Sequence, residues 1–195
     1  MGWLYIFLSC ICFGVTNCIW SVAQKKTDYL TTIINRTVFT VLFFSLPLII
    51  IKPQAAYEIT YSTILQAVII STVSCLGLIC YVYSLRFTQV SLAVPISSLN
   101  AFFGVLTAII VLSEPFHFSL LIALLLIVLA LRFLQDKTTF TFSTGVWLNI
   151  GAAFFWGVTF ALFRIPISTL GPWLFGFILE ACVLLTTFLL FVFHF

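Results

Sequence analysis

The stretch 62–85, STILQAVIISTVSCLGLICYVYSL, decides the fold, because it contains no charged residue. It is long enough to cross a bilayer as a helix, since about 20 residues span a hydrocarbon core roughly 30 Å thick. The whole 195-residue chain is similar: 63% of the residues are hydrophobic, 7% are charged, and the mean hydropathy is +1.28. A soluble domain carries roughly a quarter charged residues. The sequence therefore predicts a membrane protein.

Similar apolar runs continue on both sides of this stretch, separated by short segments that contain charged residues or proline. They predict helices near 3–23, 30–51, 62–85, 90–112, 118–134, 146–163 and 173–195. Only helices and closed barrels satisfy the backbone inside a bilayer, and the runs lack the alternating polarity of barrel strands. We expect an all-α polytopic membrane protein with about seven transmembrane helices.

A motif near the start of the chain recurs five predicted spans later. FGVT at 13–16 returns as WGVT at 156–159, an offset of 143, and Trp3-Leu4 returns as Trp147-Leu148, an offset of 144. Because five is odd, the second copy enters the membrane from the opposite side, as in the inverted repeats of secondary transporters. This divides the chain into a five-helix repeat at 1–143 and the start of a second repeat at 144–195. Matches this short also arise by chance in apolar sequences.

The stretch 83–95, YSLRFTQVSLAVP, continues through Ser97-Ser98-Leu99 to Leu112-Ser113-Glu114-Pro115. This order of a basic link, a helix opening with small residues and proline, and an acidic turn resembles EamA-type permeases of the drug/metabolite transporter superfamily. The aromatic-glycine steps at 13–14 and 156–157 and the position of Arg36 also resemble that family. The resemblance implies ten helices in two five-helix halves, and transport of small metabolites or drugs across the inner membrane.

The chain departs from this family pattern in two places. The predicted fifth helix has Ala123 and Ala130 where family members often have glycine, and the sequence ends after the seventh predicted helix. Both halves of an inverted repeat build the substrate site. We therefore expect that three further C-terminal helices or a second copy of the chain complete the bundle.

Two charged residues fall several residues inside predicted spans, away from their ends. Arg36 lies in the second predicted helix, and Glu180 occupies nearly the equivalent place in the seventh. A charge at the bilayer centre costs about 2.5–3.5 kcal/mol, so Arg36 either lines a cavity as a substrate or gating contact or reaches back to the interface. Glu180 is either a proton carrier for ion coupling or a structural partner. The two form an ion pair if their helices are neighbours.

Small and polar residues form a stripe on the first predicted helix and another on the third. Asn17 belongs to the first stripe, and Ser74 and Tyr81 belong to the second. Small residues let transmembrane helices approach closely, so both stripes also fit simple packing. Asn17 and Tyr81 need hydrogen-bond partners in hydrocarbon, either in a substrate cavity or across a helix interface.

Pro95 interrupts the fourth predicted helix beside Ser98 and Asn100. Proline has no N–H, so the carbonyl four residues earlier loses its helical donor. The missing helical hydrogen bond lies beside the Ser98 hydroxyl and the Asn100 amide. Together they make a polar notch in the helix, which either contacts substrate or acts as a hinge. The alternative is a helix that only bends.

The sequence offers no catalytic, metal or cofactor site. It has no Ser/His/Asp set, no phosphate-binding glycine loop and no metal-ligand spacing, and its six cysteines lie in apolar runs without a CxxC motif. Isolated basic residues between apolar runs are loop anchors and exclude nucleic acid as a partner.

Two functions remain. One is a secondary transporter of a small metabolite or drug-like compound in the cell (inner) membrane, with the lipid bilayer and its substrate as partners. The other is a non-transporting scaffold or partner subunit, or a truncated inactive permease.

The orientation in the membrane stays open at this point. The positive-inside rule favours an external N-terminus, which places five basic residues inside and two outside. The family resemblance implies an internal N-terminus. The two groups of basic residues are Lys25, Lys26, Arg86, Arg132 and Lys137, and Lys52 and Arg164.

Overall fold

The computed structural model describes residues 2–51, 59–115 and 143–194, together with positions 118, 122, 125, 126, 129 and 133. Within these residues all regular structure is helical, which confirms the all-α fold class for the described part of the chain. The helix predicted over 118–134 lies, apart from those single positions, outside the described residues.

The described helices overlap the predicted spans, but the last one begins at Arg164 instead of near 173. Their bounds are α1 (Gly2–Ala23), α2 (Tyr29–Thr40), η1 (Val41–Ser45), α3 (Leu46–Ile51), α4 (Tyr61–Ser84), α5 (Val90–Ser97), α6 (Asn100–Val111), α8 (Thr144–Leu162) and α9 (Arg164–His194). By length and composition, 5 described stretches can cross a membrane, namely Tyr29–Ile50, Tyr61–Ser84, Val90–Val111, Thr144–Leu162 and Arg164–Phe193. By the same measure α1 is a shorter apolar helix, Phe7–Ala23. These are the helices of a multi-pass membrane protein.

The second predicted span is continuous but changes its helix type. α2 passes through the π-helical turn η1 into α3, and the N–H of Leu46 donates to the carbonyl of Val41, five residues earlier. Pro47 explains this wide turn, because it has no N–H for the carbonyl of Phe43 and its ring crowds that oxygen. At the start of α2, the Asp28 carboxylate accepts the N–H of Leu30 at 3.1 Å and so caps the helix.

Proline or glycine interrupts the helices at two further places, one inside the predicted span 90–112 and one just before the predicted span 173–195. Pro95 lies near the end of α5, and the hydroxyl and N–H of Ser98 both donate to the carbonyl of Val94 before α6 begins. Gly171 has φ 72° and ψ 165°, a conformation that glycine adopts most readily, and it divides α9 into two segments. Pro172 then opens the longer segment, since a first-turn proline leaves no helical bond unmade.

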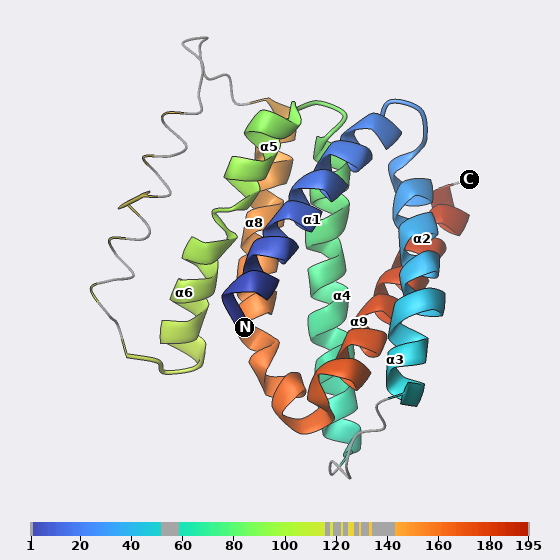
Figure 1. Ribbon diagram of the computed structural model, residues 1–195, viewed down its shortest axis with the longest axis vertical. Helices are drawn as coiled ribbons and strands as arrows, with labels where there is room; N and C mark the ends of the chain where they lie inside the picture. Colours follow the sequence, from blue (N-terminus) through green and yellow to red (C-terminus); the bar gives the residue numbers. More distant parts are fainter. Residues whose placement is uncertain are drawn as a thin grey trace.

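α4 lies at the centre of the bundle and packs against both α8 and α9 (Figure 1). α8 also packs against α5 and α6, and α9 also packs against α2 and α3. In Figure 1, α1, α4 and α9 run in one direction, whereas α2 with α3, α5 with α6, and α8 run in the other. The first helices of the two predicted repeats, α1 and α8, are therefore opposed in direction, and so are the second helices, α2 and α9. An inverted repeat requires this relation.

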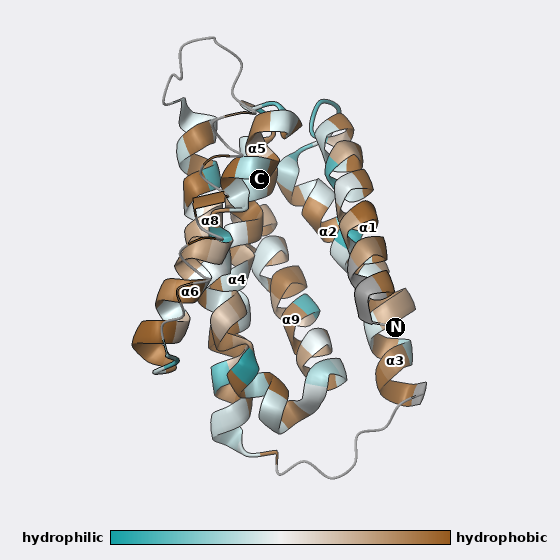
Figure 2. Ribbon diagram, turned by 60° about the vertical axis from the view of Figure 1, so that its left-hand side comes forward, coloured by the Kyte–Doolittle hydropathy of each residue, from teal (hydrophilic) through white to brown (hydrophobic). Residues whose placement is uncertain are grey.

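The main buried cluster centres on α4. It contains Ile33, Cys75, Leu78, Tyr81, Val82, Leu85, Ala93, Ala152, Trp156 and Val183. Hydrophobic residues also cover the outer faces of the helices, where Phe7 is 63% exposed and Ile110 is 75% exposed. Figure 2 shows hydrophobic residues along all the labelled helices and a hydrophilic connection between α1 and α2. Hydrocarbon on the outside accounts for this distribution.

α6 and α8 approach each other closely at Gly157. A Cβ atom added there would lie 2.5 Å from the carbonyl oxygen of Asn100, 2.5 Å from Cβ of Phe103 and 2.9 Å from the backbone nitrogen of Gly104. Gly14 holds the matching place in the first copy of the motif, and a Cβ atom added there meets no described atom within 4 Å. The two equivalent glycines therefore differ in whether a described helix packs on them.

Candidate functional site

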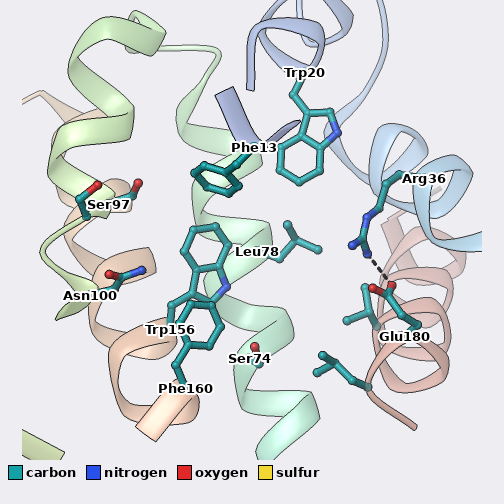
Figure 3. Close-up of a pocket in the computed structure, with 13 residues that line it drawn as sticks. Phe13, Trp20, Arg36, Ser74, Leu78, Ser97, Asn100, Trp156, Phe160 and Glu180 are labelled. Carbon is teal, nitrogen blue, oxygen red and sulfur yellow. Dashed lines mark hydrogen bonds and ion pairs between the residues drawn. The ribbon is translucent and has the colours of Figure 1, made fainter. Parts of the chain in front are cut away.

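The two charged residues predicted inside spans meet in the structure. Nη1 of Arg36 on α2 donates to Oε2 of Glu180 on α9 (Figure 3). The Glu180 side chain is 12% exposed and that of Arg36 is 35% exposed. Their separation of 144 residues equals the offset between Trp3-Leu4 and Trp147-Leu148 of the predicted repeat and differs by one from the offset of the FGVT motif. Pairing offsets the cost that each charge would have alone among apolar side chains.

This ion pair forms one wall of a cavity of about 230 Å³ between the helices. Figure 3 shows Ser97 and Asn100, from α5 and α6, on the opposite side of the cavity. Aromatic and aliphatic side chains lie between these two polar walls. The apolar lining consists of Phe13, Trp20, Leu78, Trp156, Phe160, Leu179 and Val183, and Ser74 and Ser98 also line the cavity. The site offers opposite charges, neutral hydrogen-bonding groups and flat apolar surfaces to a bound molecule.

The structure brings five of the predicted site residues to this cavity, and these are Arg36, Ser74, Ser98, Asn100 and Glu180. Pro95 lies in α5 and is absent from the lining residues described. Asn17 and Tyr81 are also absent from the lining residues described. They bind each other, since the hydroxyl of Tyr81 donates to Oδ1 of Asn17 at 2.8 Å. Of the two roles open for this pair, the structure shows the interhelical hydrogen bond.

Sequence reasoning did not identify the aromatic wall. Phe13 and Trp156 were visible only as markers of the repeat, and Trp20 and Phe160 lie on the same helices. Gly77 of α4 makes room for Trp156, since an added Cβ atom would lie 2.6 Å from the indole Cδ1. The Phe160 ring stacks on Trp156 with centroids 6.1 Å apart. The aromatic residue beside each repeat glycine was the available signal.

The described residues give little scope for metal chemistry. Within 2–51, 59–115 and 143–194, no group of three or more His, Cys, Asp or Glu side chains could hold a metal ion. The cysteines are free thiols, and Cys75 alone is buried among them. The chemistry that this site supports is reversible binding through an ion pair, hydrogen bonds and aromatic surfaces.

Comparison with known proteins gives one match. The family described as the EamA-like transporter family matches residues 1–134, which is more than half of the 195-residue chain. No curated protein matches the chain, and no solved structure matches it either.

Proposed function

Because the chain belongs to the EamA-like transporter family, we propose that it is a secondary transporter that carries a small metabolite across the cell (inner) membrane. The observation that carries the proposal is the cavity between apolar helices, with an ion pair on one wall and hydroxyl and amide groups on the other. Polar groups inside a membrane bundle are costly, and they commonly mark the path of a substrate. The family is one of transporters, so neither an enzyme nor the scaffold alternative is favoured.

The cavity supports a small substrate without a large net charge. Its volume of about 230 Å³ is below the range of roughly 300–1,000 Å³ that is typical of pockets for drug-sized ligands. The charges of Arg36 and Glu180 balance each other, so a polyanion would meet one guanidinium that is already paired. In this proposal Arg36 binds an acidic group of the substrate, and Glu180 carries the coupling proton or receives a basic group.

The transport cycle that we propose is a rocking of two inverted halves around this cavity. It is supported by the opposed directions of α1 and α8 and of α2 and α9 (Figure 1). It is also supported by the ion pair between Arg36 and Glu180, because this pair joins equivalent positions of the two copies.

A further helix against α1 is part of the same proposal. Gly157 of α8 is covered by α6, whereas Gly14, its counterpart on α1, has no described atom within 4 Å of an added Cβ atom. We propose that a helix equivalent to α6, from a second copy or from C-terminal helices, packs on Gly14. Gly14→Leu should then reduce transport strongly, because small residues permit close helix contacts. Val15→Leu is the control, since Val15 is already large and is 55% exposed. Equal transport by both variants would contradict this helix contact.

The transport test uses the purified chain in liposomes. The liposomes are loaded with a mixture of amino acids, nucleosides and organic acids, and the efflux of each compound is measured by mass spectrometry. Arg36→Ala should lower the efflux of the transported compound about tenfold or more, and Arg36→Lys should restore it only partly because the planar fork is lost. Arg164→Ala is the matched control, because Arg164 pairs with Glu114 at an exposed site. Efflux unchanged by Arg36→Ala would refute the role of Arg36. Efflux no greater than that from loaded liposomes without protein would refute transport by this chain.

A further inference from the structure

A layer of buried polar side chains joins three helices at one end of the bundle. It lies where α1 and α4 end and α8 begins, at the top of Figure 1. The hydroxyl of Tyr81 on α4 donates to Asn17 on α1 at 2.8 Å, and the hydroxyl of Ser84 on α4 bonds to Oδ1 of Asn149 on α8 at 2.9 Å. Each of these four residues is at most 1% exposed. The layer therefore holds α1, α4 and α8 together without access to solvent.

Tyr81 connects this layer to the cavity. Its ring centroid lies 6.2 Å from that of Trp20 and 5.3 Å from that of Trp156, and both indoles line the cavity. Trp20 comes from α1 and Trp156 from α8, the first helices of the two copies of the repeat. We propose that Tyr81, held by Asn17, is the gate residue that closes the cavity at the end of the bundle where α1 ends. This inference rests on the proposed function, because a gate has a role only in a transporter.

This layer and Gln24, the residue that follows α1, contain buried polar atoms that have no described partner in the closed arrangement. Nδ2 of Asn17 and both amide atoms of Gln24 are buried and have no hydrogen-bond partner among the residues that the structure describes. When the gate opens, water reaches these atoms, and the new hydrogen bonds offset the loss of the bond between Tyr81 and Asn17. The open and closed states are then close in free energy, which alternating access requires.

α1 is well placed to move in this way. Asn17 and Gln24 near its C-terminal end are 1% and 5% exposed, whereas Leu4 and Phe7 near its other end are 57% and 63% exposed. The described contacts that hold α1 are therefore concentrated at the gate. Breaking them releases the helix from α4, and no large buried interface elsewhere on α1 resists the movement in the described chain.

The test measures access to the cavity from each side of the membrane. Ser98 lines the cavity and is exposed to it, so Ser98→Cys places a reporter thiol there. Right-side-out and inside-out vesicles are treated with a membrane-impermeant maleimide, and modification is followed by mass spectrometry against the chain without the reporter. Tyr81→Phe, made in the reporter chain, keeps the ring and removes the hydroxyl. Tyr83→Phe is the matched control, because its ring contacts are described and no described hydrogen bond uses its hydroxyl.

We expect Tyr81→Phe to raise the modification rate from the gate side about threefold to tenfold, the effect of one hydrogen bond lost from the closed state. Tyr83→Phe should leave this rate unchanged. Asn17→Ala should match Tyr81→Phe, and the double variant should show no further increase because both changes remove the same bond. Asn17→Ala carries the test alone if Tyr81→Phe does not reach the membrane.

Three results would overturn the gate. The first is an unchanged rate from the gate side in both single variants, and the second is a double variant whose effects multiply. The third is a reporter that is modified from neither side, which would also refute the proposed function, because water would not reach the cavity. Liposomes that show no efflux, combined with the expected change at the reporter, would refute transport while the gate geometry stands.

Discussion

Replacing Gly157 by alanine should destabilise the protein by about 1–3 kcal/mol, the usual effect of overpacking a well-packed interface. The added Cβ atom would lie 2.5 Å from the carbonyl oxygen of Asn100, whereas ordinary van der Waals contact begins at 3.4 Å. This oxygen belongs to the backbone of α6, so it cannot turn aside as a flexible side chain would. α6 must instead move away from α8 by about 0.9 Å, the difference between those two distances.

Gly151→Ala is the internal control for this substitution, because Gly151 lies on the same helix and a Cβ atom added there would lie 3.9 Å from Sγ of Cys80, an ordinary van der Waals contact. Alanine there gains only its better helix propensity, which stabilises by about 0.5–1 kcal/mol. Thermal unfolding in a mild detergent measures both effects. For a chain of this size each kcal/mol corresponds to about 2–4 °C in the melting temperature. Gly157→Ala should therefore melt several degrees lower and Gly151→Ala at the same temperature or higher, and an equal shift in both variants would refute the packing argument.

Three further predictions follow from the site. Exchanging the charges in Arg36→Glu combined with Glu180→Arg should restore the amount of folded protein that either single change lowers, as seen by size-exclusion chromatography, and a double variant no better than the singles would contradict the pairing. Gly77→Ala should displace the indole of Trp156, 2.6 Å from the added atom, and raise the KM for efflux more than it lowers kcat; an unchanged KM would argue against Trp156 as a substrate contact. If the N-terminus is inside the cell, Lys26→Cys should react with an external impermeant thiol reagent in intact cells. Labelling only after lysis would instead indicate that the N-terminus is outside.

The helices and the charged pair could be predicted from the sequence for simple physical reasons. Bilayer thickness fixes the length of an apolar run, so α4 is almost the predicted 62–85. Arg36 and Glu180 were linked because they hold nearly equivalent positions of the predicted repeat. An ion pair was expected if their helices were neighbours, and α2 does pack against α9. The break after α5 was expected as a notch at Pro95, because proline removes a helical donor.

The aromatic wall of the cavity could not be predicted in the same way. Aromatic residues make up 17% of the chain, and Phe7, which is exposed on α1, and Phe13, which lines the cavity, both lie in the same apolar run. In a soluble protein an exposed face would be polar and would show the difference. In hydrocarbon both faces are apolar, so only tertiary packing separates a cavity residue from a lipid-facing one.

The π-helical turn at Val41–Ser45 changes how mutational data on this span should be read. An ideal α-helix turns by about 100° per residue, and a π turn adds one residue to a single turn. Side chains after Ser45 therefore point about 100° away from the direction that a helical wheel drawn from Arg36 assigns to them. A cysteine-accessibility scan along Tyr29–Ile50 should show accessibility that varies with the helical period before Val41. After Ser45 the same period should return, shifted by one residue. Fitting the residues before and after the π turn with a single helical period would wrongly assign lipid-facing residues to the cavity.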